Sequence, residues 1–380
     1  MQHSEPAQQV RQTYTSVPVS RRSATEKPTA APAFLRNPVK VGVLSNMHAG
    51  KEGSNVARVL SFLADHPEVT CVETYSSSGV QQALQELARR EVGVLVVNGG
   101  DGSLQRALTE VLRSQAFERP PVLAPLRCGR TNTSAISIGS SRDPVDAVGA
   151  VLAAARQGSL RPAEPVSIAA RAFERARTPG PVMISDRVID HPVLRVDLSD
   201  DPDPHYGMVL GPGVIHRGTE LTHRAFPTAG TQGVIGASLV TGSLIVRALL
   251  GGDDGILTPD RASLTLDGVR QKPGDYFVML ASTLARVFLR IRPYWDARPG
   301  AIHFTAITKP SIRRPADVLR VLSGREPSAS ALAAGALSRN VETAELSIDC
   351  GMMLDGEILD PKPGRNVRIS AEHSVQFLMS

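Results

Sequence analysis

The segment at residues 94–103, Val-Leu-Val-Val-Asn-Gly-Gly-Asp-Gly-Ser, has the residue types and spacing in this chain most suited to chemistry. An apolar strand would end there in a glycine-rich turn, and glycine lets the backbone approach a ligand without a Cβ clash. A helix that begins near Ser103 would direct free N–H groups at the same point, which suits a phosphate. Asp101 would then lie beside that phosphate, where a carboxylate can bind Mg²⁺ through water or accept a proton. The alternative is an ordinary strand-to-helix turn, which the clustering of glycines disfavours.

Two further loops follow predicted strands and contain residues that suit a nucleotide. Residues 44–51, Leu-Ser-Asn-Met-His-Ala-Gly-Lys, form a turn of small and polar residues. Residues 125–133, Pro-Leu-Arg-Cys-Gly-Arg-Thr-Asn-Thr, place Arg127 and Arg130 beside a Thr-Asn pair, and such side chains can hold phosphate oxygens. Each loop alone is also compatible with a solvated turn.

Short apolar segments alternate with helical patterns between residues 41 and 157. This alternation predicts a parallel sheet with helices packed on its faces. Ligands of such sheets bind at the carboxyl ends of the strands, so the three loops should share one edge. Asp143 and Pro144 are a suitable N-cap and first residue for the last helix. The predicted strands cover residues 41–44, 70–74, 93–97 and 122–124, and the helices cover residues 55–64, 80–90, 104–113 and 145–157.

The pattern changes after about residue 160, where short alternating segments predict antiparallel strands. The predicted fold class is therefore an α/β, Rossmann-like first domain with a parallel sheet, followed by a mainly antiparallel β-sandwich domain. Asp267-Gly268 lies between two such segments and predicts a hairpin turn. The expected divisions are a disordered tail at residues 1–37, an α/β nucleotide-binding domain at 38–160, a β-rich substrate domain at 161–365, and a final strand at 366–380 that packs back on the first domain.

Composition excludes some classes of protein. The chain has 380 residues and a formal net charge of +5, and its first 37 residues hold five Lys or Arg against two Glu. The remainder is close to neutral and poor in aromatic residues, which argues against a nucleic-acid-binding protein. Cys71, Cys128 and Cys350 lie far apart without a CxxC pair, which predicts reduced thiols and a cytoplasmic location.

Two other features are assigned no catalytic role. His48, His216 and His223 show no paired spacing, so we predict no zinc site and no metal cluster. The apolar segment at residues 231–250 contains one charge and three glycines and barely reaches the length of a membrane span. It predicts a buried helix that covers a sheet, or a helix that lines an apolar ligand pocket. The oligomeric state is open, and a homodimer is one option.

Together these motifs resemble the diacylglycerol kinase catalytic domain, the fold of bacterial lipid kinases, sphingosine kinases and ceramide kinases. The resemblance covers roughly residues 40–378. The motifs match in the family's order. The first is an Asn-Pro-x-Ser-Gly-like loop, matched by Asn46 and Gly50 with Met47 in place of proline, and the second is a threonine that ends the second strand, matched by Thr74. The Gly-Gly-Asp-Gly-Thr motif, a Pro-x-Gly-Thr-x-Asn-like segment and Asp-Gly-Glu follow, and they are matched by Gly99, Gly100, Asp101, Gly102 and Ser103, which keeps the hydroxyl; by Pro125, Gly129, Thr131 and Asn132; and by Asp355, Gly356 and Glu357.

The resemblance implies transfer of the γ-phosphate of ATP, with Mg²⁺, to a lipid hydroxyl such as that of diacylglycerol at a membrane surface, by an enzyme in peripheral contact with the bilayer. Which carboxylate takes the proton of the acceptor hydroxyl is left open. That Arg127 or Arg130 stabilises the charge of the transferred phosphoryl group is a hypothesis. The implied catalytic residues are Asp101, Asp355 and Glu357; the metal-binding residues are Asp101 and Glu357; the nucleotide-binding residues are Asn46, Gly50, Thr74, Gly99, Gly100, Gly102, Ser103, Thr131 and Asn132.

Three alternatives remain beside this interpretation. Asp355-Gly356 between apolar segments is by itself a strong hairpin signal. A catalytically inactive lipid- or nucleotide-binding module would keep the same fold, and Met47 and the altered 125–132 loop are consistent with one. An NAD kinase-like enzyme also uses a Gly-Gly-Asp-Gly loop, but the Asn-Glu dipeptide expected of that class is absent here.

Overall fold

The computed structural model describes most of the chain from Val39 to the C-terminus. Three predictions concern residues outside the described part: the tail at residues 1–37, the nucleotide-binding role of Gly50, and the apolar segment at residues 231–250. The described residues are 39–49, 54–114, 116–157, 182–183, 187–225, 258–308, 311, 314–360 and 362–380.

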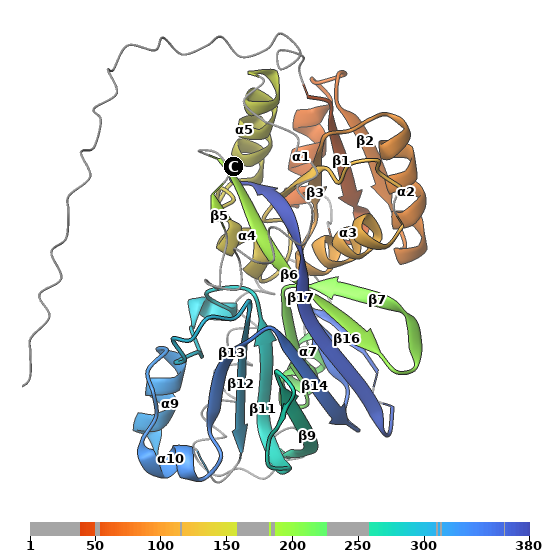
Figure 1. Cartoon of the computed structure of the whole chain (residues 1–380). Helices are drawn as coiled ribbons and strands as arrows, with labels where there is room; N and C mark the ends of the chain where they lie inside the picture. Colours follow the sequence, from red (N-terminus) through yellow and green to blue (C-terminus); the bar gives the residue numbers. More distant parts are fainter. Residues whose placement is uncertain are drawn as a thin grey trace, which may run out of the picture. The chain divides into compact units, whose positions relative to one another are not determined.

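The first part of the described chain contains four strands: β1 (Val41–Asn46), β2 (Thr70–Thr74), β3 (Val94–Asn98) and β4 (Val122–Pro125). They pair in parallel in the order β2-β1-β3-β4 (Figure 1). All four lie where the sequence predicts them, and the predicted parallel α/β region is confirmed.

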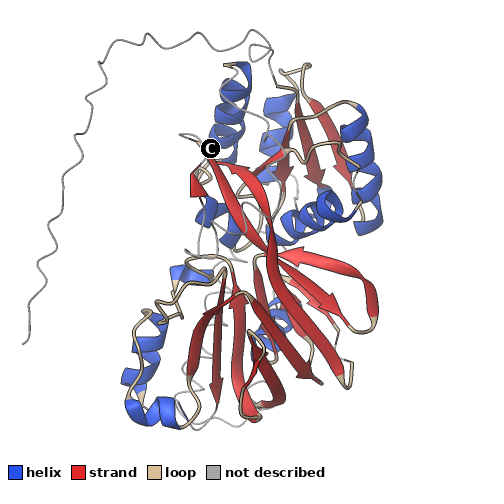
Figure 2. Cartoon of the chain, in the orientation of Figure 1, coloured by secondary structure: helices blue, strands red, loops and turns tan. Residues whose placement is uncertain are grey.

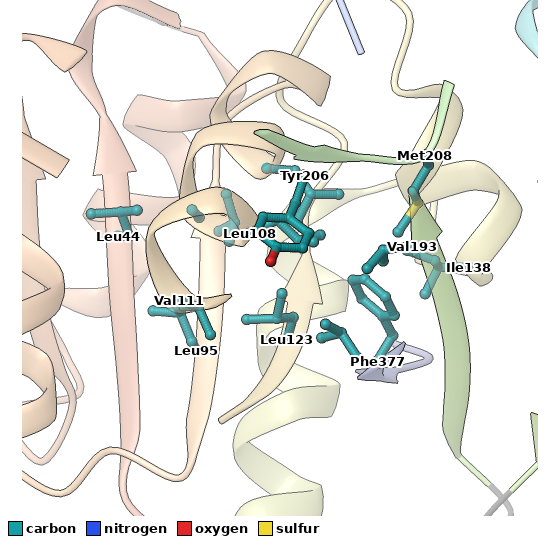
Figure 3. Close-up of a cluster of buried hydrophobic side chains, with 14 of the residues drawn as sticks. Leu44, Leu95, Leu108, Val111, Leu123, Ile138, Val193, Tyr206, Met208 and Phe377 are labelled. Carbon is teal, nitrogen blue, oxygen red and sulfur yellow. The ribbon is translucent and has the colours of Figure 1, made fainter. Parts of the chain in front are cut away.

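Helices cover both faces of this sheet (Figure 2). Successive side chains of a strand point to opposite faces, so Val94 and Val96 belong to one apolar cluster, and Leu95 and Val97 to the other. Figure 3 shows Leu95 within its cluster, together with Leu108 and other buried side chains. Helices α1 (Asn55–Leu63) and α5 (Pro144–Arg156) pack on the Val94 side, and α2 (Ser77–Arg89) and α3 (Asp101–Arg113) pack on the Leu95 side.

The ends of these helices follow local sequence. Asp143 caps α5 as predicted, since its carboxylate accepts a hydrogen bond from the Val145 N–H at 2.8 Å. The predicted start of α3 at residue 104 is too late, because the helix begins at Asp101 after an extended Gly100. Asp101 and Gly102 therefore belong to the first turn of α3, beside its free N–H groups.

The second part of the described chain is mainly antiparallel, as predicted. Its strands are β5 (Val182–Met183), β6 (Val188–Leu198), β7 (Asp201–Gly207), β8 (Val209–Pro212), β9 (Asp260–Leu266), β10 (Val269–Arg270), β11 (Gly274–Ser282), β12 (Ile302–Thr308), β13 (Leu337–Val341), β14 (Thr343–Ile348), β15 (Met352–Leu354), β16 (Glu357–Leu359) and β17 (Arg365–Leu378). The remaining helical segments are η2 (Met47–Ala49), α4 (Thr133–Ile138), α7 (Val214–Ala225), η3 (Phe288–Arg290), α9 (Pro315–Leu322) and α10 (Ala329–Ala333).

Strand β11 is where the antiparallel strands divide into two layers. One edge of β11 pairs with β12, while its other edge pairs with β9 near its start and with β8 near its end. From β9 the pairing continues to β14 and β17, and from β8 it continues to β15. An apolar cluster that includes Leu264, Phe304 and Leu346 is buried among these strands.

The long strand β17 connects the antiparallel and parallel parts. Its first residues pair with β14, it runs antiparallel to β6 over most of its length, and Phe377 pairs in parallel with Leu123 of β4. Phe377 and Leu123 lie in the same buried cluster as residues of α3 (Figure 3). Across the described residues, no helix is long and apolar enough to cross a membrane.

Candidate active site

Two glycine loops pack backbone against backbone at the carboxyl ends of β3 and β4. A Cβ added to Gly100 would lie 2.8 Å from the Cα of Gly129, and a Cβ on Gly129 would overlap the Cα of Gly100. The Cys128 N–H donates to the Gly99 carbonyl at 3.2 Å, which fixes the two loops together. Close packing, not a left-handed backbone, explains glycine at both positions.

Asp101 anchors the second loop. Its carboxylate accepts hydrogen bonds from the Thr131 hydroxyl at 2.6 Å, the Thr133 N–H at 3.0 Å and the Ser134 N–H at 2.9 Å. Helix α4 begins at Thr133, and its own N-cap residue, Asn132, gives no side-chain cap. Asp101 therefore caps α4 although it lies about thirty residues earlier in the chain. Because Asp101 is also the first residue of α3, this cap joins the starts of the two helices.

Asn132 organises the turn that leads into α4. Its backbone is left-handed, with φ of +52°, which asparagine tolerates better than most residues. Its side chain accepts from the Gly129 N–H at 2.7 Å and donates to the Gly129 carbonyl at 2.9 Å. Arg127 in the same loop donates to the Ser140 carbonyl, so it braces the loop and does not extend freely toward a ligand.

We expect Asp101→Asn to lower the free energy of unfolding by about 1–2 kcal/mol, the usual effect of losing a helix cap. An asparagine side chain keeps one oxygen and cannot accept all three hydrogen bonds. Urea unfolding would measure the change. Asp146→Asn is the control, because Asp146 is an exposed carboxylate in the first turn of α5. Equal stability of the two variants would show that Asp101 does not hold α4.

Asp355 lies at the tip of the β15–β16 hairpin, as its alternative interpretation as a turn predicts. Asp355 and Gly356 have φ of +49° and +91°, and Leu354 pairs with Glu357 across the turn. The Asp355 side chain is nonetheless buried, at 7% exposure. Its carboxylate accepts hydrogen bonds from two successive backbone N–H groups, at 2.7 Å from Met208 and 2.9 Å from Val209.

The protonation of Asp355 is unusual. Burial raises its pKa to about 8, because the charged form is desolvated. The Met208 and Val209 N–H groups lower the pKa, and the negative charge of Asp101 raises it. The influence of Asp101 shows that these two predicted catalytic carboxylates, distant in sequence, lie in one electrostatic environment.

Glu357 meets the first turn of α3. Its carboxylate forms an ion pair with Arg106, one turn along the helix. A Cβ on Gly102 would overlap the other carboxylate oxygen of Glu357, so the Glu357 side chain lies directly against the first turn of α3. Glu357 is therefore an anion beside the positive end of a helix, where it is stabilised.

A cavity of about 200 Å³ opens beside these groups, at the carboxyl ends of β1 and β2. Three predicted nucleotide-binding residues line it: Asn46, Thr74 and Ser103. The Asn46 amide donates to the Ser103 hydroxyl at 2.8 Å, and the Thr74 hydroxyl donates to the Ser45 carbonyl at 3.1 Å. The remaining lining residues are Leu44, His48, Tyr75, Ser76, Val80 and Arg106.

The predicted residues thus fall into three neighbouring groups. Thr131, Asn132 and the glycines belong to the paired loops with Asp101; Asn46, Thr74 and Ser103 border the cavity; and Asp355 and Glu357 form the hairpin tip. Arg106 was not predicted, although it lies three residues after Ser103 and so faces the same side of the helix. Arg106 both lines the cavity and pairs with Glu357 of the hairpin.

Gln105 and Thr109 form a second link that the sequence analysis missed. Both side chains donate to the Tyr206 carbonyl, at 3.1 and 3.2 Å, and the Thr109 hydroxyl accepts from the Tyr206 N–H at 3.0 Å. Tyr206 closely precedes the N–H groups that hold the Asp355 carboxylate. One face of α3 therefore fixes the backbone that positions Asp355.

Comparison with solved structures shows a similar fold. A diacylglycerol kinase from Bacillus anthracis str. Sterne is 13% identical with a TM-score of 0.53, covering 90% of this chain and 97% of its own. A putative diacylglycerol kinase from the same organism is 13% identical with a TM-score of 0.56, covering 90% of this chain and 96% of its own. These matches confirm the predicted fold class.

Comparison of sequences gives a more specific result for the first part of the chain. No curated protein gives a significant match to the chain. The family model described as the diacylglycerol kinase catalytic domain matches residues 40–166, which include the paired glycine loops, Asp101 and the residues predicted at the cavity. This part of the chain therefore matches the diacylglycerol kinase catalytic domain family.

Proposed function

We propose that this protein is a lipid kinase, which transfers the γ-phosphate of ATP to a hydroxyl group of a lipid such as diacylglycerol. One observation carries the proposal: the Asp355-Gly356-Glu357 hairpin lies against the first turn of α3, which starts in the glycine loop at Asp101. Phosphoryl transfer depends mainly on positioning and on neutralising spread charge. The family of residues 40–166 supports kinase chemistry at this site.

The cavity and the start of α3 suit a nucleotide. Asn46 and Ser103 offer an amide and a hydroxyl, and the first turn of α3 offers N–H groups to phosphate oxygens. The Arg106 guanidinium, which lines the cavity, can bind a phosphate through two N–H groups at once. ATP would thus lie with its phosphates toward the Asp355 hairpin.

The carboxylates suit Mg²⁺, which prefers oxygen ligands. The charge of Asp101 disfavours ionisation of Asp355, and a nearby divalent cation would relieve this repulsion. Among the described residues, no three His, Cys, Asp or Glu side chains could by themselves hold a metal ion. Asp101 and Glu357 would therefore share the ion with phosphate oxygens and water, the usual arrangement for Mg²⁺. When bound, Mg²⁺ would neutralise charge on the transferred phosphoryl group.

Asp355 is the stronger candidate for the group that takes the proton of the lipid hydroxyl. A general base works best when its pKa lies near the working pH, and burial brings the Asp355 pKa into that range. Glu357 is instead paired with Arg106, and Asp101 accepts three hydrogen bonds that hold α4.

Transfer of labelled γ-phosphate from Mg·ATP to presented lipids tests the proposal. The acceptors would be diacylglycerol, monoacylglycerol, sphingosine, ceramide and NAD. We expect a phosphorylated lipid whose formation falls at least about tenfold in Glu357→Gln, because the variant loses a charge beside the transferred group. Glu345→Gln is the matched control, since Glu345 is exposed on β14.

Each other outcome has a defined meaning. Phosphorylation of NAD alone would favour the NAD kinase-like alternative. ATP binding without a product from any acceptor would contradict the kinase proposal and favour a binding module. Equal activity of the Glu357→Gln and Glu345→Gln variants would remove Glu357 from the site.

A further inference from the structure

The loop at residues 286–292, which follows β11, turns a leucine away from the core. Two backbone hydrogen bonds close it: the Arg290 N–H donates to the Val287 carbonyl at 2.9 Å, and the Val287 N–H donates to the Ile291 carbonyl at 3.0 Å. Val287 is buried and Ile291 packs against the same core. Leu289 lies between them in sequence but is 49% exposed.

The backbone of the tip holds Leu289 in this position. Leu289 and Arg290 have φ of +57° and +60°, in the left-handed region that residues other than glycine, asparagine and aspartate seldom adopt. Two consecutive residues of this kind are unfavourable unless the surrounding structure holds them. The two backbone hydrogen bonds that close the loop supply that support, so the fold itself keeps Leu289 exposed.

Three arginines lie within three residues of the exposed leucine in the sequence. Arg286, Arg290 and Arg292 are all exposed, and no carboxylate in the described part of the chain pairs with them. Arg290 and Arg142 also lie near Arg127, whose pKa is lowered first by burial and then by these two positive charges. Some exposed arginines in the described residues do have acidic partners, such as Arg58 with Asp143.

The loop is attached to the candidate site. The Ser137 hydroxyl donates to the Arg286 carbonyl at 3.2 Å. Ser137 belongs to α4, the helix that Asp101 caps. The cationic loop and the predicted phosphoryl-transfer site are therefore fixed to the two ends of one short helix.

We propose that the 286–292 loop docks this protein on an anionic lipid bilayer, with Leu289 entering the interface and the three arginines contacting headgroup phosphates. The arginines match the negative surface of such a membrane, and an apolar tip adds to membrane affinity but not to nucleic-acid binding. The inference rests on the proposed function, since it places the kinase where its acceptor resides.

Co-sedimentation with vesicles tests this surface without using turnover. The vesicles are phosphatidylcholine alone, or phosphatidylcholine with phosphatidylserine. We expect binding only to the anionic vesicles, weakened by salt. Replacing all three arginines (Arg286→Gln, Arg290→Asn, Arg292→Gln) should reduce binding by about a hundredfold, at roughly fivefold for each cation near the surface.

The apolar contribution has its own variant and a matched control. Leu289→Asn removes the apolar side chain and places a residue that tolerates positive φ, and it should weaken binding about threefold or more. Val269→Asn is the control, because Val269 is 58% exposed beside Arg270 on the β10 hairpin, next to the opposite end of β11. Circular dichroism would check that each variant is folded.

The outcomes separate docking from catalysis. Unchanged binding in the triple variant, or an equal loss in Val269→Asn, would overturn the proposed surface. Absence of binding to anionic vesicles would overturn it too, while transfer to detergent-dispersed diacylglycerol would still support the kinase. Vesicle binding that depends on the loop, without phosphorylation of any lipid, would support docking and contradict the kinase. Equal retention by a polyanion such as dextran sulfate, with no effect of Leu289→Asn, would show a general anion surface and overturn bilayer docking.

Discussion

Asp355→Asn is expected to reduce phosphoryl transfer by about a hundredfold or more, the usual loss when a general base is removed. The fold should survive, because the buried carboxyl is largely protonated near neutral pH and asparagine has a similar shape. The Asn oxygen can still accept one of the two N–H hydrogen bonds from Met208 and Val209. Steady-state rates with Mg·ATP and a presented diacylglycerol would measure the loss.

The pH dependence should change with the same substitution. Because the ionised form accepts the proton, the wild-type rate should rise about tenfold per pH unit and level off at the Asp355 pKa, which is about 8 without Mg²⁺ and lower when the cation is bound. Stability should move in the opposite direction. The folded-state pKa lies above the unfolded value of 3.8, so the folded state binds more protons and stability falls as pH rises toward 8. Both trends should be weaker in Asp355→Asn.

The chain contains a matched control for this substitution. Asp267-Gly268 forms a hairpin turn of the same kind, with φ of +47° and +75°. The Asp267 carboxylate also accepts two successive N–H hydrogen bonds, both at 2.9 Å, but it is exposed. Asp267→Asn should therefore leave transfer unchanged. A similar loss in both variants would mean that turn stability, and not proton transfer, explains the effect at Asp355.

These two turns show what the sequence can and cannot predict. Asp-Gly between apolar segments predicts both hairpins, because the φ values they need are favourable for these residues. Spacing does not reveal which aspartate is buried. Burial of Asp355 depends on the N–H groups of Met208 and Val209, which lie about 150 residues earlier in the chain, and no local pattern encodes that contact.

The parallel sheet was predictable for a physical reason. Its strands are apolar on both faces, with β3 and β4 buried throughout, and the turns between elements contain strong glycine and cap signals. Helix α4 was missed because it is short and its cap comes from Asp101, about thirty residues earlier. Arg106 was missed because its role depends on Glu357, and the ion pair joins residues 251 positions apart.

The paired glycines provide the second large expected effect. Gly129→Ala should lower the free energy of unfolding by about 1–3 kcal/mol, the usual effect of overpacking, because the new Cβ overlaps the Cα of Gly100. The two loops must separate to accept it, and a shift of about 1 Å at a reacting centre can reduce a rate about a hundredfold. Urea unfolding and rates of phosphoryl transfer would measure both effects.

Two further variants identify this contact as the cause. Gly149→Ala, in α5, has only Phe62 at 3.9 Å and should stabilise the protein by about 0.5–1 kcal/mol, since alanine is the better helix former. Gly100→Ala should resemble Gly129→Ala, because its Cβ would lie 2.8 Å from Gly129. Once the loops have separated for one methyl group, the second meets less resistance, so the double variant should lose less stability than the two single losses combined. Strict additivity would show that the glycines act independently and that close packing of the two loops does not position the site.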